Sequence, residues 1–97
     1  MEYKNEQFGL SFSVPDKVTV RQQLAFYSEA ARASGDELFE RMWLGARTVI
    51  QDWKCTAMPD LNANIDELTD PDAAGAIVWA SMRVKEHMDG LENIPKN

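Results

Sequence analysis

The segment between residues 70 and 90 carries apolar side chains on two sides of one predicted helix, and this pattern limits the possible folds most strongly. Asp70 is the expected N-cap, and Pro71 is the expected first helical residue. Val78, Trp79 and Met82 lie together on one side. A separate stripe has the spacing of a core-facing side and consists of Ala73, Ile77, Ala80, Val84, Met88 and Leu91. Such a helix is either buried centrally or presents one side to a partner, and the sequence leaves both alternatives open.

Two further helices are predicted upstream of this segment. The first begins at Thr19, which fits a capping box with Gln22, and it ends at Gly35. Its apolar stripe is Val20, Leu24, Tyr27 and Ala31. The second begins near Asp36, where the side chain can act as an N-cap. Its apolar stripe is the best defined and consists of Leu38, Phe39, Met42, Ala46, Val49, Ile50 and Trp53. Because the connection is short, we expect an antiparallel helical hairpin. A single helical turn is also expected at residues 65–68.

A short strand is predicted near the N-terminus. Apolar and small residues alternate strictly from Phe8 to Val14, which is typical of a half-buried strand, and Pro15 ends the pattern. A lone strand leaves its backbone donors and acceptors unpaired. We therefore expect it to pair with residues 2–5, with residues 17–20, with a second copy of the chain or with a different protein.

These elements predict a mainly α fold, a small bundle of three main helices with a short N-terminal β-strand or hairpin. A chain of 97 residues has room for one hydrophobic core. Residues 1–97 are therefore expected to form a single domain, with a strand region at 1–18 and a polar tail at 92–97.

The chain is acidic, with a formal net charge of −6. Nucleic-acid binding depends on Lys and Arg contacts to phosphates, and the ten basic residues are scattered, so we expect no nucleic-acid partner. The acidity favours solubility, and it also fits mimicry of nucleic acid or docking on a basic partner. No apolar run approaches the roughly 20 residues of a membrane helix, and the N-terminus does not resemble a signal peptide. These features predict a cytoplasmic location and no membrane partner.

The sequence offers few residues for catalysis. Cys55 and His87 are the only residues of their types, and they stand 32 positions apart with no metal-binding spacing around either. The acids between Asp60 and Asp72 lack the spacing and the central glycine of an EF-hand loop. We predict a non-enzymatic protein with no catalytic residue, no metal and no cofactor. A small enzyme that uses Cys55 and His87 is the least favoured alternative.

Several stretches together resemble small tailed-phage proteins encoded near the tape-measure gene, in particular tail assembly chaperones. These stretches are residues 13–24, Trp53-Lys54-Cys55 with Pro59-Asp60, residues 77–80 leading to Glu86-His87, and residues 94–97. The resemblance covers most of the chain. It implies a mainly helical protein that escorts the tape-measure protein in the host cytoplasm and is absent from the mature virion. Tail proteins such as the tape measure and tail tube are the implied partners, and self-association is also implied.

The sequence therefore predicts a protein-binding assembly factor that acts during phage tail assembly. Seven residues on the predicted strand and on the exposed sides of the helices are the expected binding residues. They are Phe8, Leu10, Phe12, Trp43, Val78, Trp79 and Met82. The alternative function is an acidic inhibitor or decoy that blocks a host factor or a nucleic-acid-binding factor, which requires a contiguous acidic face.

Overall fold

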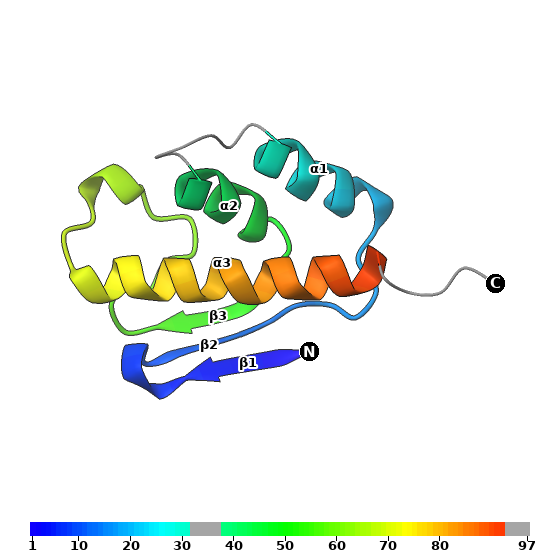
Figure 1. Cartoon of the computed structure of the whole chain (residues 1–97). Coiled ribbons are helices and arrows are strands. Elements are labelled where there is room, and N and C mark those ends of the chain that lie inside the picture. Colours follow the sequence, from blue (N-terminus) through cyan, green and yellow to red (C-terminus); the bar gives the residue numbers. More distant parts are fainter. Residues whose placement is uncertain (32–37, 93–97) are drawn as a thin grey trace.

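The chain folds into helices packed on an antiparallel sheet, in a computed structural model that describes residues 1–31 and 38–92. The elements in chain order are β1 (Glu2–Asn5), the 3₁₀ helix η1 (Glu6–Phe8), β2 (Leu10–Ser13), α1 (Val20–Ala31), α2 (Leu38–Ala46), β3 (Gln51–Cys55), the 3₁₀ helix η3 (Ile65–Glu67) and α3 (Pro71–Glu92). Figure 1 shows α3 crossing the middle of the molecule, with the α1–α2 pair on one side and the strands on the other. The central position of α3 explains why this helix is apolar on two sides.

The strands β1 and β2 form a hairpin whose connection is shaped by local hydrogen bonds. The side-chain oxygen of Asn5 accepts the backbone N–H of Gln7 at 3.0 Å. Gly9 then takes a φ of 57°, a left-handed conformation that glycine adopts without steric cost. The hairpin register pairs Tyr3 with Phe12. The predicted pairing with residues 2–5 is therefore confirmed, whereas Val20 begins α1 and residues 17–20 form no strand.

The strand β3 reaches β2 from a distant part of the chain and completes the sheet order β1-β2-β3. Leu10 lies opposite Cys55, and the register shifts between Ser11 and Ser13. At this shift Asp52 takes a φ of 54°, and the Ser13 hydroxyl donates to its carboxylate at 3.1 Å. Aspartate adopts this left-handed conformation more readily than most residues, which suits it to the bulge. Because β2 is paired on both sides, its backbone is not available to a second copy or to a different protein.

The predicted three-helix bundle is wrong, because the described chain is a small α+β domain with a three-stranded antiparallel sheet. The error lies mainly after residue 46, where the predicted second helix ends early. Thr48 N–H bonds to Gly45 O at 3.2 Å, and Val49 N–H bonds to Ala46 O at 3.1 Å, so the last turn tightens and the helix stops. The chain then enters β3. Val49, Ile50 and Trp53 matched a helical stripe because they face the core, although they do so from a loop and a strand.

The helix α1 begins as predicted but buries a different side. The backbone N–H of Gln22 donates to the Thr19 hydroxyl at 3.1 Å, and that of Thr19 donates to the Gln22 side chain at 3.0 Å, which confirms the capping box. Val20 and Leu24 are 70% and 63% exposed, whereas Phe26 is buried. The predicted stripe is therefore wrong at Val20 and Leu24, although Tyr27 is half-buried against the core, because α1 packs mainly on α2 and turns Phe26 toward it. The two helices run side by side in opposite directions, as predicted (Figure 1). The predicted helix end at Gly35 and N-cap at Asp36 lie outside the described residues, as does the tail beyond residue 92.

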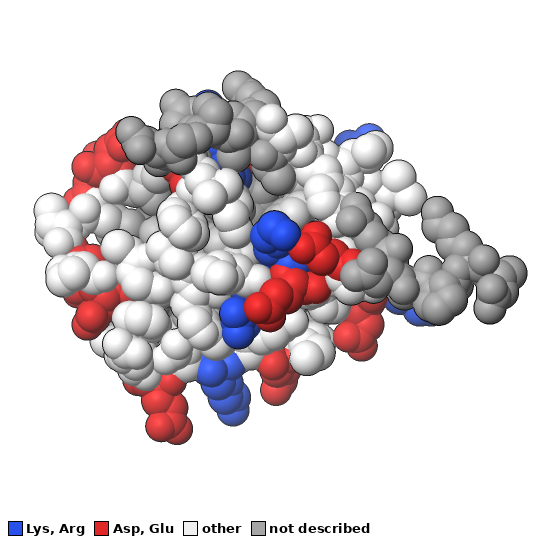
Figure 2. All heavy atoms as spheres, viewed as in Figure 1, with Lys and Arg blue, Asp and Glu red and all other residues white. Residues whose placement is uncertain are grey.

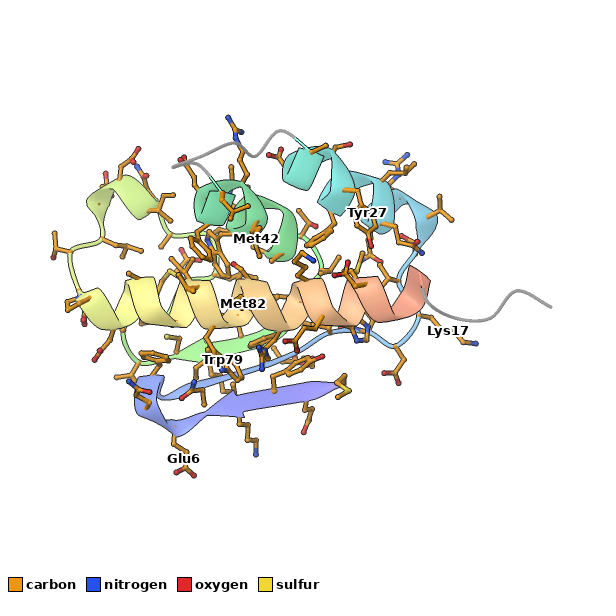
Figure 3. All side chains as sticks on the ribbon, in the orientation of Figure 1. Glu6, Lys17, Tyr27, Met42, Trp79 and Met82 are labelled. Carbon is orange, nitrogen blue, oxygen red and sulfur yellow. The ribbon has the colours of Figure 1, made fainter. Side chains whose placement is uncertain are left out.

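The helix α3 supplies the centre of the core. Its N-cap is confirmed, since the carboxylate of Asp70 accepts the backbone N–H of Asp72 at 2.9 Å. The predicted core stripe is buried at Ala73, Ala80, Val84 and Met88 and half-buried at Ile77. On a second side Trp79 packs edge-on against Tyr3 and Phe12, with ring centroids 6.5 and 6.1 Å apart. Figure 3 shows Trp79 pointing from α3 toward the strands. The central position of α3 therefore explains why Trp79 packs against the core, whereas Met82 on the same helix remains 43% exposed to solvent.

Candidate protein-interaction surface

The structure separates the seven predicted binding residues into core and surface positions. Leu10, Phe12 and Trp43 are 3%, 2% and 0% exposed, so they stabilise the fold from within. Trp43 lies 5.4 Å from the Trp53 ring, and Phe12 lies 5.8 Å from the same ring, which links α2 to the sheet through aromatic contacts. Phe8 is half-buried in η1 and packs against α3.

Val78 and Met82 are the predicted binding residues that line open surface. Val78 borders a hollow of about 260 Å³ between α2, the η3 region and the first turns of α3. Met82 borders a second hollow of about 400 Å³ between α2 and the later turns of α3. Phe39 of α2 lines both hollows, so the two adjoin at this side chain. We call the two adjoining hollows together the α2–α3 groove; its apolar walls are Leu38, Phe39 and Met42 of α2, Ile77, Val78 and Met82 of α3, Ile65 of η3, and Leu68, which follows η3.

Large apolar side chains are exposed on the walls of this groove. Leu38 and Phe39 are each 45% exposed, and Met82 across from them is 43% exposed. Isolated exposed apolar residues are ordinary on protein surfaces, but a contiguous set beside a depression is typical of an interaction site. Figure 2 shows uncharged surface over much of this face, with acidic side chains at its left and lower edges and a mixed acidic and basic cluster right of centre. In Figure 3, Met42 lies between α2 and α3, where the two walls meet.

The rim of the groove is more acidic than basic. Glu40 and Asp70 border the first hollow, and Glu86 and Asp89 border the second together with Lys85. Lys85 forms an ion pair with Asp89 one helical turn away, which offsets part of this charge. Among the described residues, neither Glu40 nor Asp70 has an ion-pair partner. Glu86, by contrast, forms an ion pair with Arg83 at 2.8 Å, so the excess of negative charge lies at the first hollow, beside Glu40 and Asp70.

The side of α3 that faces β1 is closed by polar contacts. The Arg83 guanidinium lies 5.5 Å from the centre of the Trp79 ring and bonds to Glu86 at 2.8 Å. Burial raises the pKa of the Tyr3 phenol above its usual value of 10.0, and the nearby Glu86 carboxylate adds to the rise while Arg83 opposes it. These contacts fix Trp79 against the sheet, so Trp79 stabilises the fold and does not form part of the α2–α3 groove.

The structure does not bring Cys55 and His87 together. The Cys55 thiol lies 3.8 Å from the carbonyl oxygen of Phe8, before β2 begins, whereas the His87 ring contacts the carbonyl of Pro15, after β2 ends, at 3.1 Å. The length of β2 and its flanks separates these two points by roughly 20 Å at about 3.3 Å per residue. Within residues 1–31 and 38–92, no three His, Cys, Asp or Glu side chains are placed to share a metal ion.

Comparison with known proteins identifies no relative of this chain. No protein-family model, no curated protein and no solved structure matches the chain. None of the helices in the described part of the chain has both the length and the apolar character needed to cross a membrane.

The sequence pattern identified Val78 and Met82 but missed the other wall of the groove. Leu38 and Phe39 matched the stripe of the predicted second helix and were therefore assigned to the core. The sequence around Leu38 and Phe39 does not show that these side chains are exposed, because their exposure depends on how much of α2 is covered by α3. A helical wheel drawn for residues 38–46 alone shows the same apolar side with or without a partner.

Proposed function

We propose that this protein is a non-enzymatic assembly factor that binds and escorts the tape-measure protein during phage tail assembly. The observation that carries the proposal is the α2–α3 groove, where Leu38, Phe39 and Met82 expose apolar surface together. The resemblance of the sequence to tail assembly chaperones, which extends over most of the chain, supports the choice of partner. The same proposal includes binding to the tail tube protein and to further copies of the chain.

The groove suits a protein that holds a partner temporarily. Apolar walls favour association because binding removes them from water, at about 25 cal/mol for each Å² buried. The walls at Leu38, Phe39 and Met82 are only partly exposed, and the core is buried without a partner. An escort must release its partner, and a modest apolar contact area with a charged rim fits this requirement better than a large obligate interface.

The decoy alternative receives less support from the distribution of charge. A mimic of nucleic acid needs carboxylates in a continuous stripe. On the face shown in Figure 2, acidic side chains are separated by uncharged surface or stand beside basic ones. The pairs Arg83–Glu86 and Lys85–Asp89 belong to this mixed arrangement.

The proposal is tested by co-expression with the tape-measure protein encoded in the same tail gene cluster. We expect the chain to raise the soluble fraction of the tape-measure protein and to elute with it in one complex on size-exclusion chromatography with light scattering. An unrelated acidic protein of similar mass serves as the control and should do neither. Two outcomes overturn the proposal: a tape-measure protein that is equally soluble with the control, or a gene that lies outside any tail gene cluster.

A further inference from the structure

We propose that the α2–α3 groove binds a single amphipathic helix of its partner, whose apolar stripe is flanked by Lys and Arg. This inference rests on the proposed function, because it takes the partner to be a protein, and it names the chemistry of the segment that is bound. It draws on the length of the groove, the character of its walls and the charge of its rim.

The length of the groove fits a helix of four to five turns. The α3 residues that line it extend from Ala73 to Asp89. At 1.5 Å per residue this stretch is about 24 Å long, the length of a helix of about 16 residues. Phe39 stands between the two hollows, whose centres along α3 are about 15 Å apart, or roughly three helical turns. A bound helix would therefore place large apolar side chains near positions i and i+11 and smaller ones against Phe39.

The walls of the groove favour a helix over an extended segment. Two of the walls are the helices α2 and α3, whose backbone N–H and C=O groups are paired within each helix except in the end turns, and Ile65 and Leu68 line the first hollow only. An extended segment in the groove would find no continuous row of backbone partners and would leave most of its own polar groups unpaired against apolar walls. A helix satisfies these groups internally and offers only side chains, which is what an apolar groove between helices accepts.

The charge of the rim determines which residue types are favoured beside the apolar stripe of the bound helix. Glu40 and Asp70 border the first hollow, where no described lining residue is basic, whereas the acids of the second hollow, Glu86 and Asp89, are paired with Arg83 and Lys85. Lysine or arginine beside the apolar stripe would meet these carboxylates, whereas acidic flanks would be repelled. A second copy of this chain is disfavoured, because each copy carries a net charge of −6 and brings no excess of basic residues to Glu40 and Asp70.

The test uses two synthetic helical peptides of about 18 residues with the same apolar stripe and with either Lys or Glu on both flanks. Fluorescence anisotropy measures the binding of each labelled peptide to the full-length protein. We expect the Lys peptide to bind at least about tenfold more tightly than the Glu peptide. The difference should shrink as salt rises from about 50 mM to about 500 mM, because the rim charges are exposed.

Variants of exposed residues locate the binding site without disturbing the core. Phe39→Ser and Met82→Ser remove apolar walls, and each should weaken binding of the Lys peptide about tenfold. Leu24→Ser is the matched control, since Leu24 is 63% exposed on α1 and does not line the groove. Circular dichroism checks that all three variants keep the fold.

The possible outcomes separate this inference from the proposed function. Equal binding of the two peptides, or equal loss in Leu24→Ser and Met82→Ser, overturns the inference. If both groove variants still form the complex with the tape-measure protein, the proposed function stands and the groove is not the binding site. If sedimentation shows a wild-type dimer that Phe39→Ser dissociates, a second copy occupies the groove and the inference is wrong.

Discussion

Replacing Gly75 by alanine tests the contact that fixes η1 on α3. Gly75 lies inside α3, and a Cβ at this position would stand 2.6 and 2.7 Å from two ring carbons of Phe8. Carbon atoms in contact normally lie about 3.5–4.0 Å apart, so the ring would have to withdraw by about 1 Å. Gly90 lies in the same helix, where an added Cβ would meet no atom within 4 Å, and it provides the matched control.

Two opposing terms set the size of the effect. Alanine stabilises a helix interior by about 1 kcal/mol relative to glycine. Burying a whole Phe side chain contributes about 1.5–3 kcal/mol, so the half-buried ring of Phe8 contributes about 1 kcal/mol, and much of this is lost when the ring withdraws. We expect Gly75→Ala to change the free energy of unfolding by less than about 0.5 kcal/mol, because these terms nearly cancel. Gly90→Ala should stabilise by about 0.5 kcal/mol, since it lies near the helix end.

A double-mutant cycle with Phe8→Ala isolates the contact. Without the ring, Gly75→Ala should show its full helix preference and stabilise by about 1 kcal/mol, which gives a coupling energy of about 1 kcal/mol. Urea unfolding followed by circular dichroism measures all four members of the cycle, and thermal unfolding should show a shift of about 4–8 °C per kcal/mol. If Gly75→Ala stabilises by the same amount with and without Phe8, the reasoning fails, because the ring then does not press on Gly75.

Three further outcomes are expected. Gly9→Ala should lower the free energy of unfolding by about 1–2 kcal/mol, because the φ of 57° is unfavourable for alanine and the new methyl would overlap Thr56; an unchanged urea midpoint contradicts this. Asp70→Ala should cost about 1 kcal/mol by removing the N-cap of α3, and Asp70→Asn should cost less; equal losses in urea unfolding would mean that the cap bond is not the cause. The raised pKa of Tyr3 means that its contribution to stability is complete below about pH 10 and is lost as pH rises through the folded-state pKa. Tyr3→Phe should therefore lessen the fall in stability above pH 10, and the phenolate absorbance lost in this variant should titrate above 10.

The features predicted correctly are those determined by a few neighbouring residues. The N-cap at Asp70, the capping box at Thr19 and the single turn, predicted at residues 65–68 and found at Ile65–Glu67, each depend on hydrogen bonds that span two or three positions. The core stripe of α3 was also predictable, because its spacing is set by the helix itself. These local interactions form independently of how the rest of the chain folds.

The strand β3 could not be predicted, because its partner decides its conformation. Residues 49–53 contain β-branched and aromatic side chains that fit a strand, but they also continue the apolar spacing of the preceding helix. Asp52 adds a left-handed conformation that no pattern of apolar residues reveals. The free edge of β2 selects the strand, and that edge is remote in sequence.

The candidate site was predicted in part for a similar reason. Met82 was recognisable because it lies off the core stripe of its own helix. Phe39 was not, because whether it is covered depends on the place where α2 crosses α3. The apolar pattern of a helix shows which of its sides faces inward, but the neighbouring helix determines how much of that side is covered.

The pairing of β2 with β3 has a consequence for how the chain folds. Ser13 and Gln51 are neighbours across the sheet but stand 38 positions apart, with the whole α1–α2 hairpin between them. Closing a loop of this length costs conformational entropy before any contact offsets it, so we expect the sheet to form late and folding to be slower than in a helical bundle of equal size. The helix α3, which supports both the sheet and the hairpin, comes last in the described chain. The buried residues of the strands and of all three helices form one cluster, so a proteolytic cut between β3 and α3 should unfold the whole domain rather than release a folded fragment.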